Sequence, residues 1–157
     1  MSMERARAHL ARYGLDGQIR EFEASSATVE LAAEAVGCEP ARIVKTLSFK
    51  APDGCLLLLC AGDAKVDNAK FKQVFGFKAK MLEREEAEEL IGHAVGGVCP
   101  FGVNPGVKVF FDQSIRRFDV VYPAAGTGNS AVKLTIPELA RACPDAQWVD
   151  ACKGWTV

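Results

Sequence analysis

The alternation of hydrophobic and polar positions along the chain predicts interleaved secondary structure, with roughly five helices and eight strands. Helical spacing of hydrophobic residues occurs at 4–13, 29–36, 67–75, 83–91 and after Thr135. Stretches typical of strands lie at 18–23, 42–50, 55–61, 77–81, 107–112, 118–122 and 131–135. Without an internal repeat or a low-complexity linker, this order indicates one α/β domain over residues 1–157.

Capping residues and turns refine this prediction. Thr28 can cap the helix at 29–36, and Gly37 can end it in the left-handed conformation. The turn Pro52-Asp53-Gly54 joins two strand-like stretches, so we expect these strands to form an antiparallel hairpin. The sheet should therefore be mixed and largely antiparallel, which disfavours a doubly wound parallel fold.

Composition and charge limit the function classes. The 157 residues are 49% hydrophobic and 25% charged, as in an ordinary globular domain with a substantial core. The 19 Lys and Arg against 20 Asp and Glu leave a net charge of −1. Because such a chain has no general attraction to a phosphate backbone, it is not expected to be an architectural nucleic-acid binder. Any contact with RNA must be local.

The cysteines and histidines do not form a metal-binding pattern. The six cysteines contain no Cys-x-x-Cys pair, and the only histidines are His9 and His93, so we expect no zinc site and no cofactor. The apolar run from Cys55 to Cys60 is typical of a buried strand in which cysteine acts as a small hydrophobe. With no signal peptide and no membrane-spanning stretch, the sequence predicts a cytoplasmic protein with reduced thiols and no membrane partner.

Lys45 is the first candidate for chemistry. Period-2 alternation places it on the same face of its strand as Ile43, Leu47 and Phe49. Moving an ammonium group out of water costs several kcal/mol unless an anion compensates, so this position favours an anion-binding role. The alternative is a lysine whose stem covers the sheet edge while its charge stays in water.

The second candidate is the glycine-rich run Gly96-Gly97-Val98-Cys99-Pro100-Phe101-Gly102. Glycines allow the backbone to approach a ligand closely and to aim N–H groups at an oxyanion. The run lacks the lysine and the following helix of a phosphate-binding P-loop, and it continues into a further turn at Asn104-Pro105-Gly106. A long loop of this kind is typical of a functional segment, although similar runs also form ordinary turns.

Taken together, these segments resemble the YbaK/ProX family of aminoacyl-tRNA deacylases, the free-standing relatives of the bacterial prolyl-tRNA synthetase editing domain. The resemblance covers residues 28–140. Its specific part is Lys45-Thr46-Leu47 followed by Gly-Gly-x-x-Pro-x-Gly, and four further blocks support it in the same order. It implies a curved, partly barrel-like mixed sheet flanked by helices, with the site at one end of the sheet.

The resemblance implies hydrolysis of the ester that joins an amino acid to a ribose hydroxyl. The loop would supply backbone amides to the oxyanion, and the lysine would anchor the terminal adenosine. The catalytic residues implied are Lys45, Gly96, Gly97 and Val98, without a metal or a catalytic triad. The residues expected to contact the substrate are Thr28, Thr46, Cys99, Pro100, Phe101, Gly102, Gly126, Asn129 and Ser130. The expected partner is the acceptor end of a mischarged tRNA, and a synthetase such as prolyl-tRNA synthetase is a candidate second partner.

Three questions stay open at the level of sequence. Cys99 could be a nucleophile activated by His93, which would make the protein a thiol hydrolase, or it could be a small loop side chain. The pocket could also bind an aminoacyl or nucleotide group without turnover. Cysteine on tRNA(Pro) is the family's commonest substrate, but Ala131 stands where the cysteinyl-tRNA deacylases carry an aspartate, so the amino acid removed is not determined.

Overall fold

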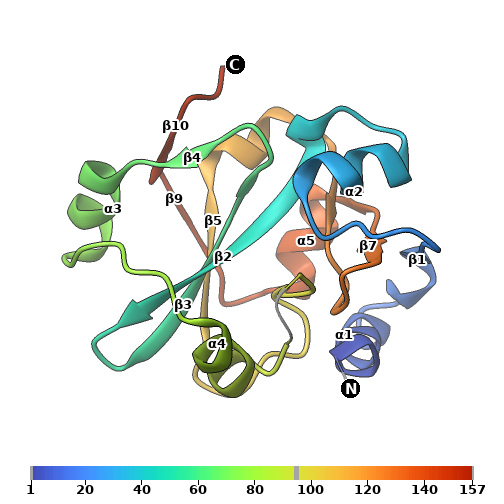
Figure 1. Cartoon of the computed structure of the whole chain (residues 1–157), viewed down its shortest axis with the longest axis horizontal. Helices are drawn as coiled ribbons and strands as arrows, with labels where there is room; N and C mark the ends of the chain where they lie inside the picture. The colour runs from blue at the N-terminus through green and yellow to red at the C-terminus, as the bar shows by residue number, and fades with distance from the viewer. Residues whose placement is uncertain (1, 94–95, 157) are drawn as a thin grey trace.

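The computed structural model describes residues 2–93 and 96–156 (Figure 1). Its helices are α1 (Ser2–Ala11), α2 (Val29–Val36), α3 (Asn68–Phe75), α4 (Arg84–Ile91) and α5 (Ile136–Ala142). Its strands are β1 (Ile19–Glu21), β2 (Ile43–Ala51), β3 (Gly54–Ala61), β4 (Lys65–Val66), β5 (Lys108–Asp112), β6 (Val120–Pro123), β7 (Ser130–Val132), β8 (Leu134–Thr135), β9 (Gln147–Val149) and β10 (Cys152–Lys153). Three 3-10 helices lie at Asp16–Gln18, Pro40–Arg42 and Gln113–Arg117.

Six strands form the main sheet, in the order β8-β6-β2-β3-β5-β9. At its centre, β2 and β3 form an antiparallel hairpin. Its register runs from the pair Val44 and Ala61 at the open end to the pair Ala51 and Gly54 at the turn. β6 joins the other edge of β2 in parallel, but only at Ile43 and Val44. β5 runs parallel to both β3 and β9, while β8 is antiparallel to β6. Two small antiparallel ribbons, β1 with β7 and β4 with β10, complete the topology.

Alternating side chains of β3 divide the core into two layers. Leu57 and Leu59 belong to one hydrophobic cluster, which also receives residues from α1, α4 and α5. Leu58 and Cys60 belong to the other cluster, which receives residues from α3 and β10. The two sides of the sheet are called here the α4 face and the α3 face. Figure 1 shows α3 at one side of the molecule and β1, β7 and α1 at the opposite side.

Aromatic packing fixes α3 on its face. The Phe71 side chain is fully buried, with its ring centroid 4.8 Å from that of Phe49 on β2 and 4.5 Å from that of Phe75. Phe75 in turn lies edge-on to Phe110 of β5 at 4.9 Å. Such aromatic contacts are worth about 0.5–1.5 kcal/mol each beyond the buried area. They hold the polar surface of α3 in a fixed position relative to β2.

The mixed α/β class expected from the sequence is confirmed, and several local predictions are also met. The side chain of Thr28 caps α2 by accepting a hydrogen bond from the Leu31 N–H at 3.2 Å, and Gly37 ends the helix at φ 84°. The hairpin forms at the predicted turn. In the described chain, three of the five pairings of the main sheet are parallel. The antiparallel pairings are the central hairpin, β6 with β8, and the two ribbons.

The predicted strands at 77–81 and 131–135 differ from the observed structure. Near Met81 the chain makes only an isolated bridge to Phe49, because it touches the edge of β2 briefly before α4 begins. The stretch 131–135 divides into β7 and β8, which pair with β1 and β6 respectively. The division falls at Lys133, whose N–H bonds to the Gln18 carbonyl. The short strands β4, β9 and β10 were not predicted, because two or three residues cannot display an alternation.

Within residues 2–93 and 96–156, no helix is both long enough and apolar enough to cross a lipid bilayer. The six cysteines carry no disulfide, and all but Cys38 are buried.

Candidate active site

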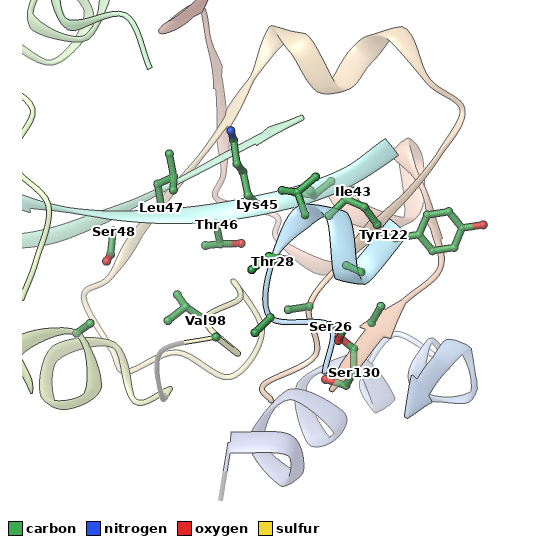
Figure 2. A pocket seen from close by; sticks show the side chains of 18 of the residues that line it. Ser26, Thr28, Ile43, Lys45, Thr46, Leu47, Ser48, Val98, Tyr122 and Ser130 are labelled. Carbon is green, nitrogen blue, oxygen red and sulfur yellow. The ribbon is translucent and has the colours of Figure 1, made fainter. Parts of the chain in front are cut away.

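A cavity of about 410 Å³ lies on the α4 face, where the edge of β2 meets three loops. The N-terminal part of α4 closes one end of the cavity. The loops contribute residues 26–29, Gly96, Val98, Tyr122, Ala124, Ser130 and Ala131. The polar side chains of the described lining are hydroxyls and cations, with no carboxylate and no imidazole among them. Figure 2 shows Ser26, Thr28 and Ser130 on the side of this cavity opposite Ser48, with Val98 beneath the strand.

The edge of β2 is open where it borders the cavity. β6 leaves this edge after Val44, and the next contact is the hydrogen bond from the Leu82 N–H to the Ser48 carbonyl at 3.1 Å. Lys50 also uses this edge, because its N–H donates to the Lys80 carbonyl at 2.8 Å. Backbone groups alternate along a strand, so the N–H and C=O of Thr46 point into the same opening. The Thr46 Oγ1 is buried and has no hydrogen-bond partner among the described residues.

Lys45 and Thr46 lie on opposite sides of β2. Figure 2 shows Lys45 and Leu47 on one side of the strand, and Thr46 and Ser48 on the side of Val98. Lys45 therefore shares the α3 face with Leu47 and Phe49, as the alternation of the sequence predicts, while it also borders the cavity at the open edge. It is partly buried and forms no ion pair with a described residue.

Asp63 is a carboxylate whose pKa responds to the charge of Lys45, but it already forms an ion pair with another residue. The Arg117 guanidinium forms a short ion pair with Asp63. This hydrogen bond is the main cause of the lowered pKa of Asp63, and the charge of Lys45 makes a smaller contribution. Because Asp63 is committed to Arg117, the Lys45 ammonium remains available for an external anion.

The glycine run forms a tight loop against the turn at 126–128. Gly96 has φ 95°, a conformation that favours glycine. Gly97 is buried, and a Cβ at this position would lie 2.4 Å from the Thr127 backbone nitrogen. Gly97 is therefore required for close approach to residues 126–127 rather than for a positive φ. The N–H groups of Gly96, Gly97 and Val98 donate to no described residue. Gly96 and Val98 border the cavity, whereas Gly97 lies behind its lining.

Helix α1 holds both ends of this loop. Arg5 donates through Nη1 to the Gly92 carbonyl at 3.2 Å and through Nη2 to the Asn104 side-chain oxygen at 2.8 Å. His9 Nδ1 accepts a hydrogen bond from the Gly102 N–H at 3.0 Å, and its Nε2 donates to the Ala142 carbonyl at 2.6 Å. These two bonds require the neutral imidazole with its proton on Nε2. Burial, the largest influence, lowers the pKa of His9.

His93 and Cys99 lie behind the loop rather than in the cavity. His93 is buried, and its Nε2 donates to the Phe101 carbonyl at 2.6 Å, while its Nδ1 has no partner in the described chain. The Cys99 thiol is fully buried, 3.6 Å from His93 Nε2, and burial raises its pKa to about 12. Because His93 Nε2 carries a proton for Phe101, it cannot act as the base that would deprotonate Cys99.

The structure divides the sequence-predicted site residues into two groups. Those that line the cavity are Thr28, Lys45, Thr46, Gly96, Val98 and Ser130. Those that lie outside its lining are Gly97, Cys99, Pro100, Phe101, Gly102, Gly126 and Asn129. In this second group Asn129 ties its turn to the Phe22 carbonyl at 2.9 Å, and Pro100 borders a separate cavity of about 620 Å³ beside α1. The remaining members support the loop from behind.

Several lining residues had no signal in the sequence. Arg84 begins α4, is exposed, and borders the cavity as a second cation without a described ion-pair partner. Met81 is 54% exposed at the mouth. Ser26 and Ser48 add hydroxyl groups. Ala131, which the resemblance had already singled out, contributes only a methyl group to the wall. The acidic pattern of 83–89 marks a solvated helix, and nothing in it distinguishes Arg84 from its neighbours.

The fold and this site define an editing domain. Residues 23–142 match the family model of the aminoacyl-tRNA editing domain, which is more than half of the chain, so the protein belongs to that family. It is 47% identical over 156 residues to the uncharacterized protein YwhH of Bacillus subtilis (strain 168), with 99% of both chains covered. A solved structure of a protein proposed to be a trans-editing enzyme for prolyl tRNA synthetase has a TM-score of 0.88 at 32% identity, with 98% of each chain covered.

A shorter similarity extends to a synthetase. Over 78 residues, 49% of this chain, the protein is 30% identical to the proline–tRNA ligase of Bacillus cereus (strain AH820). The matched segment is 14% of the ligase, so the similarity concerns one region of that enzyme. No cluster of three or more potential metal ligands occurs among the residues that the structure describes.

The close approach of Gly97 to residues 126–127 leads to a first prediction. Gly97→Ala should lower the free energy of unfolding by about 1–3 kcal/mol, because the added methyl group must displace a backbone segment. Gly128→Ala in the same turn is the matched control, since its Cβ would meet the Ala27 Cβ at an ordinary 3.6 Å. Urea unfolding of both variants measures the difference, and equal losses would contradict the close packing of Gly97.

The two histidines predict how stability depends on pH. Burial is the main cause that lowers the pKa of both His9 and His93, so the folded protein keeps them neutral. As the pH falls below about 6.5, the histidines of the unfolded chain bind protons while those of the folded chain stay neutral, so the free energy of unfolding decreases. The decrease ends once the pH is below the lowered pKa values of the folded protein. Each histidine should contribute up to about 1.4 kcal/mol per pH unit in this window.

Urea unfolding between about pH 7.5 and about pH 5.5 tests this expectation against a variant that cannot titrate there. His9→Gln with His93→Gln keeps an N–H donor at each position and should flatten the pH dependence over this range. If the wild-type protein and the double variant lose stability with the same slope, the histidines are not responsible.

Proposed function

We propose that the protein hydrolyses the ester bond of a mischarged aminoacyl-tRNA. The observation that carries the proposal is a cavity at the open edge of β2 that is lined by both Lys45 and Thr46. Gly96 and Val98 of the glycine loop line the same cavity, and their N–H groups donate to no described residue. Membership of the aminoacyl-tRNA editing family supports the substrate class. A ligand that touches both Lys45 and the loop must cross the edge of β2, because the two lie on opposite sides of that strand.

In the proposed reaction, a water oxygen bonds to the ester carbonyl carbon, and the carbonyl oxygen becomes an oxyanion. The N–H groups of Gly96, Gly97 and Val98 are the proposed donors to this oxyanion. One such donor is worth about 3–4 kcal/mol of transition-state stabilisation in a preorganised site. Collapse of the tetrahedral intermediate breaks the bond to the ribose oxygen, which leaves with a proton as the free hydroxyl group.

The attacking water must give up a proton, and a group other than a carboxylate or an imidazole must accept it. The described lining offers hydroxyls but no carboxylate or imidazole. We therefore assign this role to a second water or to the neighbouring ribose hydroxyl of the substrate, with Thr46 as its hydrogen-bonding partner. The Ser130 hydroxyl is already bonded to Thr127. The unpaired Thr46 Oγ1 supports this assignment, because a buried hydroxyl without a partner costs free energy until a ligand satisfies it.

Lys45 is proposed to hold the phosphate or sugar of the terminal adenosine on the α3 face. The amino acid would then occupy the cavity on the α4 face, where Ala27, Ala131 and Ser130 form part of the wall. These small side chains favour a small amino acid, with Cys on tRNA(Pro) as the leading candidate. Neighbouring amino acids that differ by one methylene are separated by only about 1–3 kcal/mol in such a pocket.

A thiol hydrolase that uses Cys99 is the weaker alternative. The thiol is fully buried, lies outside the cavity lining and has a raised pKa of about 12. A nucleophile must be reachable by substrate and at least partly deprotonated. A binding module without turnover would share the same cavity, and only an assay for released amino acid separates it from the deacylase.

Lys45→Met is the direct test of the lysine, because methionine keeps an apolar stem and removes the charge. We expect kcat/KM for deacylation to fall about 10- to 150-fold, the value of a charged hydrogen bond of about 1.5–3 kcal/mol. The melting temperature should stay close to that of the wild-type protein. Lys133→Met, an exposed lysine away from the cavity, is the control. Full activity of Lys45→Met would refute the assignment.

Cys99→Ser separates the two hydrolytic mechanisms. The backbone mechanism predicts activity within about threefold of wild type, because the main chain is unchanged and a serine hydroxyl can still donate to the Phe101 carbonyl. A nucleophilic thiol predicts a loss of several orders of magnitude and a covalent acyl adduct on Cys99. Mass spectrometry of the protein mixed with substrate would detect that adduct, and its presence would overturn the backbone mechanism.

A further inference from the structure

The charges of two consecutive segments are strongly separated. Residues 65–80 contain five lysines and one aspartate, a net charge of +4. Residues 83–89 contain five glutamates and one arginine, a net charge of −4. The overall net charge of −1 conceals this separation. Because attraction to a polyanion depends on local potential, the position of each segment decides what the surface can bind.

The fold places these segments on opposite faces of the sheet. α3 packs through Phe71 into the cluster on the α3 face, and α4 packs through Ile91 into the cluster on the α4 face. The β4–β10 ribbon lies on the α3 face, because Cys152 of β10 packs there with Cys60 of β3. Figure 1 shows this ribbon and α3 on the same side of the molecule. Lysines from segments distant in sequence thus gather on one face.

The lysines of this face are largely uncompensated. The exposed lysines that form no ion pair with a described residue are Lys65, Lys72, Lys78 and Lys153. Lys80 is not counted with them, because its charge contributes to the lowered pKa of Glu86 on α4. The nearby carboxylates are engaged elsewhere, since Asp67 caps α3 at the Lys70 N–H, Asp150 pairs with the Lys70 ammonium and Asp63 pairs with Arg117. Asp67 still lies close enough to Lys153 for that charge to contribute to its lowered pKa.

One pair of lysines indicates an anionic ligand directly. Lys65 and Lys153 are register partners in the two-stranded β4–β10 ribbon, so their side chains project from the same face at adjacent positions. Like charges directly opposite each other destabilise a strand pair. An anion bound between them would remove this repulsion.

We infer that the surface formed by Lys65, Lys72, Lys78 and Lys153, called here the basic face, binds the phosphate backbone of the acceptor stem. The inference rests on the proposed function, which brings the 3′ end of a tRNA to the cavity. Lys45 connects the two regions, because it lies on the α3 face and also borders the cavity. A stem that approached over α4 would meet the exposed Glu85, Glu88 and Glu89 instead.

The test compares two triple variants of equal net charge. The first variant removes three charges from the basic face, outside the cavity lining, and combines Lys65→Gln, Lys72→Gln and Lys153→Gln. The control variant combines Arg7→Gln, Arg20→Gln and Lys133→Gln. It removes three exposed charges from α1, β1 and the chain beside β7, at the opposite side of the molecule. The probe is an uncharged RNA minihelix with the acceptor stem and CCA end of tRNA(Pro), so binding is measured without catalysis.

We expect the first triple variant to raise the Kd about 10- to 100-fold at low salt and to reduce the slope of log K against log salt by about two to three, while the control changes neither. The triple Lys→Arg variant should restore both values. Equal binding by the two Gln variants would overturn the basic face, even if deacylation persists. Binding that depends on the basic face without release of any amino acid would instead retain this surface and refute the proposed function.

Discussion

The open edge of β2 is the constraint on which the candidate site depends. A central strand normally satisfies its N–H and C=O groups on both sides, and an unpaired edge costs free energy when it is buried. Here β6 departs after Val44 and the chain at 80–82 makes contact only from Ser48 onward, so the polar groups of Thr46 face the cavity. A ligand that pairs with them would complete the strand. Binding and sheet formation therefore use the same hydrogen-bonding groups.

A mechanism based on main-chain amides places its demands on rigidity rather than on side-chain chemistry. The loop at 96–102 is held from behind by the turn at 126–127 and at its ends by Arg5 and His9 of α1. These contacts are remote from the cavity, but an oxyanion hole works only when its donors are already oriented before reaction. The buried His93 and Cys99 fit this role, since both bond to the Phe101 carbonyl and neither reaches the cavity.

In the proposed function, the two faces of the sheet divide the recognition of a single substrate. The α4 face provides a small pocket of hydroxyl and methyl groups, suited to an aminoacyl group. The α3 face carries Lys45 and the basic face, suited to phosphates. Because the substrate must pass from one face to the other across the edge of β2, a misplaced acceptor end would leave the ester away from the loop. Such a division would link the affinity for RNA to the accuracy of positioning.

The sequence alone predicted those features of this protein that depend on the conformational preferences of neighbouring residues. The capping of α2 by Thr28, the β2–β3 hairpin and the placement of Lys45 beside Leu47 follow from propensity and period-2 alternation. Only tertiary structure left the edge of β2 open beside Thr46, brought Arg84 to the cavity and placed Cys99 behind the loop rather than in the pocket. Tertiary structure also placed Lys65 directly across from Lys153 in the β4–β10 ribbon. These outcomes depend on which distant strands pair and which face each helix covers, and long-range packing, rather than spacing along the chain, sets both.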